Sequence, residues 1–221
     1  MKSDTKKILV IRFSSLGDVI LTSPLITALR NEFPGGNIDY LTKKKYAEVL
    51  RSNPLVNNII EADDDLDFKG LKQLKRHLRQ NSYDLVIDAH NNPRTFYLKL
   101  LLKAQKLSFR KYSIRKFLLV RLRINLMKKL PPIAQRYINI LRPLLDNRKE
   151  SENLLPEIFS DNASKQNAGI VLGGLNIPAD RKLICICPAS VHFTKTYPAE
   201  QYAELINRFD ENTFAFLLTG K

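Results

Sequence analysis

Short runs of aliphatic residues alternate along the first half of the chain with segments whose apolar positions recur every three or four residues. The runs expected as buried strands are Ile8–Ile11, Asn37–Thr42, Asn57–Glu61 and Asp84–Ala89. The segments expected as helices are Asp18–Phe33, Lys44–Arg51, Leu66–Gln80 and one that follows Pro93 and ends near Ala104. Successive β-α-β units with short loops predict an α/β domain, a Rossmann-like doubly wound parallel sheet with right-handed crossovers.

The second half of the pattern is less regular. A short strand is expected at Leu107–Phe109, a basic helix at Phe117–Leu126, a helix at Ile133–Leu145 and a helical piece near Asn167–Leu172. A further unit follows, with strands at Leu183–Cys187 and Thr213–Leu218 and a helix at Pro198–Phe209. We therefore predict a domain over 1–150, a connection over 151–180 and the first β-loop-α-β unit of a second Rossmann-like domain over 181–221. Since so few strands make a poor sheet, the pattern favours a fragment of a longer two-domain protein.

Charge is concentrated in one segment. The 221 residues carry a net charge of +14, and between Asp88 and Asp146 there is no acidic residue but fourteen Lys and Arg residues. Such a segment attracts a polyanion, which can be a nucleic acid, an anionic membrane surface or an anionic glycolipid. The alternative is a solvated basic face without a specific partner. The residues of the Phe117–Leu126 helix equally allow docking on an anionic membrane or packing on the domain.

The two cysteines and the hydropathy indicate the compartment. Cys185 and Cys187 lie one residue apart in a predicted strand, where a mutual disulfide would be strained, so buried packing in a reducing environment is expected. No uninterrupted apolar stretch reaches the roughly 18 residues needed to span a membrane, and the N-terminus lacks a signal-peptide pattern. We predict a soluble cytoplasmic protein, with peripheral contact at the inner membrane as a further possibility.

Candidate chemistry lies in two polar turns that follow buried strands. Ser14–Gly17 leads into Asp18 after the first strand, and His90–Asn92 with Arg94 follows the strand that ends at Ala89. Both turns are expected at the carboxyl edge of the sheet, where open α/β sheets bind ligands. Taken alone, Asp18 is more simply a helix cap and His90 a loop histidine. No metal-ligand spacing predicts a metal site, and no GxGxxG motif supports a nicotinamide or flavin enzyme.

Four segments together carry a resemblance to a known family. They are the strand with Ser-Ser-Leu-Gly-Asp-Val, DLVIDAHNNPR, Gln135-Arg136-Tyr137, and CPAS followed by TKTYPAEQYAELI. In this order and spacing the chain resembles the lipopolysaccharide heptosyltransferases from Lys7 to its end. The resemblance implies a GT-B architecture and inverting transfer of heptose from ADP-heptose to a core-oligosaccharide hydroxyl. It also implies that the reaction needs no metal or cofactor, the nucleotide sugar being a substrate.

The resemblance further implies roles for individual residues. Asp18 matches the general base, and Lys195 matches the cation that meets the donor diphosphate, with Ser190 and Thr194 in the same loop. The residues implied on the acceptor side are Ser14, Ser15, Gly17, His90, Asn91, Arg94 and Arg136. The donor loop departs from the usual family pattern, since Pro188-Ala189-Ser190 stands in place of Pro-Gly-Ala and Lys195-Thr196-Tyr197-Pro198 in place of Lys-Arg-Trp-Pro. The alternatives are a non-catalytic glycosyltransferase fragment and, less favoured, a basic nucleic-acid-binding protein.

Overall fold

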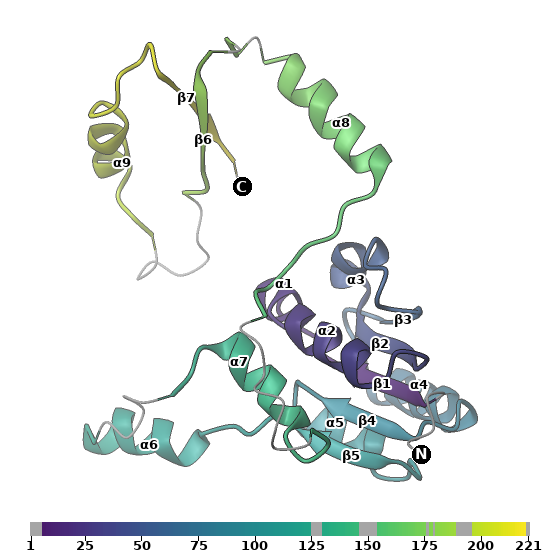
Figure 1. Cartoon of the computed structure of the whole chain (residues 1–221). Coiled ribbons are helices and arrows are strands. Elements are labelled where there is room, and N and C mark those ends of the chain that lie inside the picture. Colours follow the sequence, from purple (N-terminus) through teal and green to yellow (C-terminus); the bar gives the residue numbers. More distant parts are fainter. Residues whose placement is uncertain are drawn as a thin grey trace. The chain divides into compact units, whose positions relative to one another are not determined.

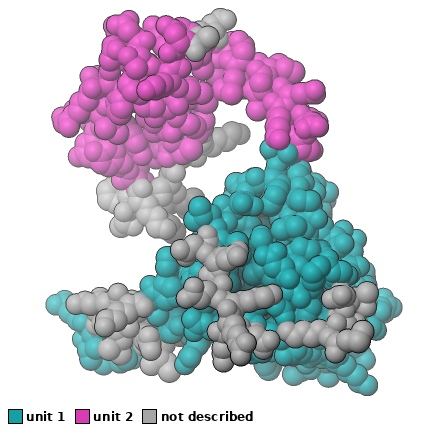
Figure 2. Space-filling view, viewed as in Figure 1, with its two compact units in different colours: residues 1–160 teal, residues 161–221 magenta. Residues whose placement is uncertain are grey.

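The computed structural model describes residues 6–124, 130–145, 154–175, 177–178, 180–188 and 196–219, with the side chains of 113–116 left out. The chain forms two compact units, Met1–Ser160 and Asp161–Lys221, which Figure 2 colours separately. Each unit is treated by itself below. The helix that opens the second unit lies inside the segment 151–180 that the sequence pattern assigned to a connection.

The first unit is an α/β domain built around one parallel sheet (Figure 1). Its elements are β1 (Lys7–Ile11), α1 (Leu16–Ile20), α2 (Ser23–Glu32), β2 (Asn37–Lys43), α3 (Lys44–Arg51), β3 (Asn58–Ala62), α4 (Phe68–Gln80), β4 (Leu85–Asp88), α5 (Pro93–Lys99), β5 (Gln105–Ser108), α6 (Ser113–Leu122), α7 (Ile133–Ile138) and the 3-10 helix η1 (Asn139–Leu141). The five strands lie in the order β3-β2-β1-β4-β5, and every neighbouring pair is parallel. This order confirms the predicted doubly wound sheet.

Two apolar layers cover the sheet because β1 is aliphatic on both faces. Ile8 and Val10 face a layer that includes side chains of α2, α3, α7 and η1. Leu9 and Ile11 face a second layer with side chains of α4 and α5. All four side chains are fully buried, as a parallel sheet with helices on both sides requires. β1 is the central strand of the sheet and is covered on both faces, so the segment that follows it starts from the middle of the domain.

The predicted helix Asp18–Phe33 is divided in two. α1 ends at Ile20 and α2 begins at Ser23. Thr22 Oγ1 donates to the Val19 carbonyl at 2.6 Å, and Ser23 Oγ donates to the Ile20 carbonyl at 2.8 Å. Hydroxyl groups that bond back to nearby carbonyls compete with the regular helical ladder. The single long helix was therefore wrong, and α1 is a separate short helix that carries Asp18.

The predicted helix Ile133–Leu145 is also shorter than expected. α7 ends at Ile138, and η1 continues only to Leu141. Pro143 follows two residues later, and proline has no backbone N–H with which to continue the helical hydrogen bonds. In the basic segment, α6 begins at Ser113 and ends at Leu122, whereas the pattern placed the helix at Phe117–Leu126. The C-cap of α6, Arg123, has a φ of 56° in the left-handed region, which ends the helix.

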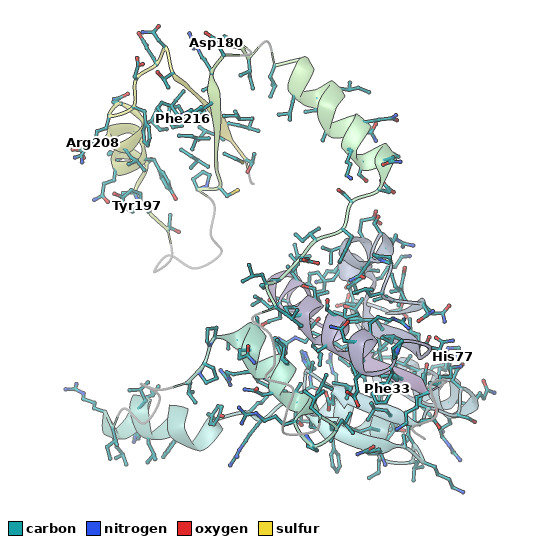
Figure 3. All side chains as sticks on the ribbon, in the orientation of Figure 1. Phe33, His77, Asp180, Tyr197, Arg208 and Phe216 are labelled. Atoms are coloured by element: carbon teal, nitrogen blue, oxygen red, sulfur yellow. The ribbon has the colours of Figure 1, made fainter. Side chains whose placement is uncertain are left out.

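The second unit contains α8 (Asn162–Gly173), β6 (Lys182–Ile186), α9 (Ala199–Ile206) and β7 (Phe214–Leu218). β6 and β7 pair in parallel, as predicted. α8 starts earlier than the helical piece expected near Asn167, because Asp161 caps it by accepting from Ser164 N at 2.7 Å. The ring of Phe209 packs against the ring of Phe216 in β7, with 5.5 Å between the two ring centroids; Phe216 is labelled in Figure 3.

The expectation of buried cysteines is wrong. Cys185 and Cys187 are both exposed, and neither forms a disulfide. Their exposure follows from the small size of this sheet, in which β7 is the partner of β6 among the described strands. Cys187 Sγ instead lies 2.9 Å from Thr219 Oγ1. A separate result concerns the helices: none in the described segments is both long and apolar enough to cross a lipid bilayer.

Candidate active site at the carboxyl edge of β1 and β4

The two predicted polar turns meet where the strand order reverses. β2 lies on one side of β1 and β4 on the other, so the chain connections leave the central strand in opposite directions. Ile11 pairs with Asp88 in the parallel register, which brings the carboxyl ends of β1 and β4 together. Arg12 joins the two ends directly, because its Nη1 donates to the Ala89 carbonyl at 2.8 Å. Ligands of doubly wound sheets bind at this position.

Asp18 lies in the first turn of α1 and is contacted from three elements. Its Oδ2 accepts hydrogen bonds from the Ser15 amide at 3.2 Å and from Ser15 Oγ at 3.0 Å. The same oxygen pairs with Arg12 Nη2 at 2.5 Å. Its Oδ1 accepts from the Tyr137 hydroxyl at 3.3 Å. Asp18 therefore helps to cap α1, as the simpler interpretation predicted. Its Oδ1 accepts one long hydrogen bond, whereas Oδ2 has three donors.

The ionisation of Asp18 reflects opposing influences. Partial burial raises its pKa, but the Ser15 hydrogen bonds and the Arg12 guanidinium together lower the pKa below the ordinary value of 3.8. The carboxylate is consequently ionised at neutral pH. Because about a third of the Asp18 side chain is exposed, at 32%, the anion is accessible to a ligand. An ionised, accessible carboxylate can accept a proton from a hydroxyl group placed against it.

Two residues of this cluster had no role in the sequence predictions. Arg12 follows the buried strand directly, and Tyr137 lies on α7, 119 residues from Asp18. Burial raises the pKa of Tyr137 to about 12, Arg12 partly opposing it, so the phenol stays protonated and donates to the carboxylate. The guanidinium of Arg12 lies 5.6 Å from the Tyr137 ring centroid. The sequence offered one signal for Arg12: it is a cation directly after a buried aliphatic strand. A charge near the interior of a protein needs a partner, so such a residue is expected to form an ion pair.

Asp88 shapes the turn that carries His90 and Asn91. Its side chain is fully buried, and Oδ1 accepts from the His90 amide at 3.1 Å and the Asn91 amide at 2.6 Å. Asn91 has a φ of 47°, in the left-handed region that asparagine tolerates better than most residues. The Asn91 side chain donates to the Phe109 carbonyl at 2.8 Å. Asn91 is thus a structural link between β4 and the segment after β5.

Asp88 forms a buried ion pair with Lys99. Lys99 Nζ lies 2.5 Å from Asp88 Oδ2, and the two side chains are 9% and 0% exposed. The same ammonium group donates to Ser108 Oγ at 2.6 Å. Pairing is required because an isolated buried carboxylate would be strongly unfavourable. The sequence analysis assigned no role to this pair.

His90 is neutral at physiological pH. Its pKa is lowered from 6.5 to about 4, chiefly by burial; the nearby cations Arg12 and Lys111 also lower the pKa, and Asp88 and Asp18 oppose the change. Its ring packs edge-on to Phe13 at 5.8 Å, and its Nδ1 is buried without a hydrogen-bond partner among the described residues. A neutral imidazole is suited to accept or donate a single hydrogen bond to a ligand hydroxyl.

The remaining predicted acceptor residues of these turns lie at the same edge with different exposure. Ser14 is half-buried, whereas Gly17 and Arg94 are exposed, Arg94 in the first turn of α5. A Cβ added to Gly17 would meet no heavy atom within 4 Å in the described surroundings. Gly17 therefore leaves open space beside Asp18.

Arg136 faces a separate basic pocket next to the cluster. Its guanidinium stacks between Phe109 and Tyr112, 4.9 Å from each ring centroid, and its Nε is buried without a hydrogen-bond partner among the described residues. The pocket has a volume of about 300 Å³ and is lined by Leu107, Ser108, Phe109, Arg110, Tyr112, Arg136, Asn139, Ile140, Arg142 and Pro143. Three guanidinium groups and no carboxylate line it. This composition favours an anion such as a phosphate or carboxylate.

The sequence analysis assigned three residues to the donor side. Ser190, Thr194 and Lys195 lie outside the described residues. Across the segments that the structure does describe, no three His, Cys, Asp or Glu side chains gather in a way that could hold a metal ion.

Comparisons with known proteins now identify the family. The profile of glycosyltransferase family 9 (heptosyltransferase) matches residues 71–221. The chain belongs to glycosyltransferase family 9. Lipopolysaccharide heptosyltransferase 1 of Pseudomonas aeruginosa is 33% identical over 92 residues, an alignment that covers 38% of this chain and 26% of that protein. This chain thus spans about a quarter of the length of that curated relative.

Solved structures agree with the family assignment. A glycosyl transferase family 9 protein from Veillonella parvula is 26% identical, has a TM-score of 0.81, and is matched over 100% of this chain and 64% of its own. The ADP-heptose lipopolysaccharide heptosyltransferase II of Escherichia coli is 22% identical, with a TM-score of 0.70 over 97% of this chain and 64% of its own, and shows the shared GT-B-like fold. The suspected family is confirmed, and the nucleic-acid alternative is not favoured.

Proposed function

We propose that this chain is part of a heptosyltransferase that transfers heptose from ADP-heptose to the lipopolysaccharide core oligosaccharide. The proposal rests on Asp18 in a family 9 chain. Its carboxylate is ionised, lies near the carboxyl edge of β1, and accepts only the Tyr137 hydrogen bond at Oδ1 among the described contacts. The family 9 relatives include proteins that use ADP-heptose. The reaction is inverting and independent of metal and cofactor.

The chemistry assigned to Asp18 is general-base catalysis. An acceptor hydroxyl gives its proton to Asp18 Oδ1 as its oxygen forms a bond to the anomeric carbon of the heptose. The bond between that carbon and the diphosphate oxygen breaks, and ADP leaves with the electron pair. A carboxylate with a low pKa suffices, because the developing oxocarbenium character of the sugar withdraws electrons from the attacking oxygen. Donor contacts are assigned to Ser190, Thr194 and Lys195, whose residue types suit phosphate oxygens.

The acceptor is assigned to the first unit. Ser14, Ser15, His90 and Asn91 offer hydroxyl, imidazole and amide groups for sugar hydroxyls, with room left by Gly17. Arg94 and the Arg136 pocket offer guanidinium groups for an anionic substituent of the glycolipid. This assignment uses the excess positive charge of the segment between Asp88 and Asp146.

Membrane contact is assigned to α6 and its C-terminal extension. Phe117, Val120 and Leu122 are 61%, 74% and 56% exposed, and Ile124 follows at 47%. The exposed Arg121 and Arg123 lie among them. Apolar side chains flanked by cations bind the interface of anionic bilayers. We therefore place the protein in the cytoplasm, peripherally on the inner membrane.

The transfer proposal is tested by ADP release from ADP-heptose in the presence of core oligosaccharide. Wild type is compared with Asp18→Asn, which keeps the shape of the side chain and removes its basicity, and with Asp63→Asn, which changes an exposed aspartate that follows the edge strand β3. We expect a loss of about 100-fold or more for Asp18→Asn, the usual contribution of a general base, and wild-type rates for Asp63→Asn. Equal rates for all three proteins would remove Asp18 from the mechanism.

The membrane proposal has its own test. The wild-type chain should co-sediment with vesicles that contain phosphatidylglycerol and should not co-sediment with vesicles of phosphatidylcholine alone. The double variant Phe117→Ser with Val120→Ser should sediment less, and Phe68→Ser, which changes an aromatic residue of α4 that is 71% exposed, should behave as wild type. Unchanged sedimentation of the α6 variant would exclude α6 as the docking element.

A further inference from the structure

The two oxygens of Asp18 have very different surroundings. Oδ2 receives the Arg12 guanidinium at 2.5 Å and both donors of Ser15, at 3.0 and 3.2 Å. Oδ1 receives the Tyr137 hydroxyl, at the longer distance of 3.3 Å. One hydrogen bond at 3.3 Å is weaker than a charge-assisted contact at 2.5 Å together with two further hydrogen bonds. An incoming hydroxyl therefore meets less competition at Oδ1 than at Oδ2.

Arg12 is itself held in place more firmly than an ordinary surface arginine. Its side chain is 11% exposed, and Nη1 is fixed by the Ala89 carbonyl at 2.8 Å. Its guanidinium also lies on the Tyr137 ring, at 5.6 Å from the centroid. The planar fork thus bridges the end of β4, the carboxylate on α1 and an aromatic ring on α7. A guanidinium fixed in this way loses little conformational freedom when it orients a carboxylate.

We propose that Arg12 is the positioning residue of the catalytic carboxylate: it binds Oδ2 of Asp18, directs Oδ1 towards the acceptor hydroxyl and holds a positive charge against the carboxylate. The inference rests on the proposed role of Asp18 and adds the group that controls it. Arg12 does not itself touch the reacting atoms. In this arrangement the carboxyl edge of β4 supports the base through the Ala89 carbonyl.

Other charged and titratable groups face Asp18 from the elements packed around it. Ser15 and Arg12 come from the β1–α1 segment, Tyr40 from β2, His90 from the turn after β4 and Tyr137 from α7. Burial keeps His90 neutral, with a pKa of about 4, and burial raises the pKa of Tyr40 and of Tyr137 above that of a free tyrosine. Arg12 is therefore the group in direct contact that carries a positive charge at neutral pH.

The test measures the Asp18 carboxyl directly. Its pKa is followed by the carboxyl carbon chemical shift during a pH titration of the full chain, in wild type, Arg12→Met and Arg12→Lys. We expect Arg12→Met to raise the Asp18 pKa by about one to two units, the usual influence of an adjacent guanidinium, because burial then acts unopposed by the cation. Arg12→Lys should restore part of the difference, since it keeps the charge but loses the planar group that binds Asp18 and the Ala89 carbonyl at once.

The pH profile of ADP release should change in parallel. Its acid limb should move to higher pH in Arg12→Met, while Arg51→Met, which removes an exposed arginine paired with Glu48 and Glu61, should leave both readouts unchanged. An Asp18 pKa in folded Arg12→Met equal to that of wild type would overturn the proposal. If wild type releases no ADP, the transfer function fails, while the titration still decides whether Arg12 controls the Asp18 carboxylate.

Discussion

Replacing Lys99 by Met should leave the Asp88 carboxylate buried without its cation. Asp88 is 0% exposed, the Lys99 side chain 9% exposed, and their charged atoms lie 2.5 Å apart. Removing one partner of a buried pair costs about 3–5 kcal/mol. Asp88 keeps the amide donors of His90 and Asn91, so we expect the free energy of unfolding to fall by about 3 kcal/mol, the lower end of that range. In a domain of this size the melting temperature should fall by about 6–12 °C.

Urea unfolding of the full chain, followed by circular dichroism and tyrosine fluorescence, measures this loss. Tyrosine is the appropriate reporter because the chain has eight Tyr and no Trp. Lys106→Met is the matched control, since Lys106 is exposed on the neighbouring strand β5. The double variant Asp88→Asn with Lys99→Met should recover more than half of the loss, because no unpaired charge remains. A loss below about 1 kcal/mol for Lys99→Met would refute the argument, because that is the range of surface pairs.

Further variants test the packing, the pH dependence and the helix starts. Leu25→Ala removes a fully buried side chain of α2 and should lower the free energy of unfolding by about 2–5 kcal/mol in urea titrations. The pKa of His90 is lowered to about 4 in the folded chain, so the unfolded chain binds the extra proton first; stability should fall as the pH decreases from about 6.5 to 4, and less steeply in His90→Gln. Asp67→Ala removes the α4 cap, in which Oδ1 accepts an amide hydrogen bond at 2.7 Å, and should cost about 1 kcal/mol in the same titrations. Gly17→Ala should raise thermal stability by about 0.5–1 kcal/mol, since the added Cβ meets no atom; a loss of stability would show that the space beside Asp18 is filled.

The centre of the sheet was predictable because β1 and most of β4 are short aliphatic runs. β1 and β4 bury every one of their central side chains, and no other element of this length fits such a run. Helix boundaries were less predictable, since they depend on single hydrogen bonds. The hydroxyl groups of Thr22 and Ser23 divide one periodic segment into α1 and α2, and the apolar spacing does not register that break.

The candidate site was predictable where its residues lie in or next to the polar turns after β1 and β4. Asp18 lies at the start of α1, after the turn that follows β1, and His90 lies in the turn that follows β4, so the rule for parallel sheets places them at the same edge. Tyr137 reaches Asp18 from 119 residues away, and Lys99 reaches Asp88 from the far end of α5. Such pairs arise from how α5 and α7 pack on the sheet, and a single sequence does not encode that packing as a local pattern.

Gly17 illustrates a choice between stability and access. It lies in the first turn of α1, where any other residue except proline would favour the helix more, and no close approach of neighbouring atoms in the described surroundings requires glycine there. Glycine at this position thus leaves the folded chain less stable than it need be, while the surface beside the carboxylate stays bare. Natural proteins commonly sacrifice stability at the positions that a ligand must reach. The start of α1 therefore favours access of a ligand to Asp18 over stability of the helix.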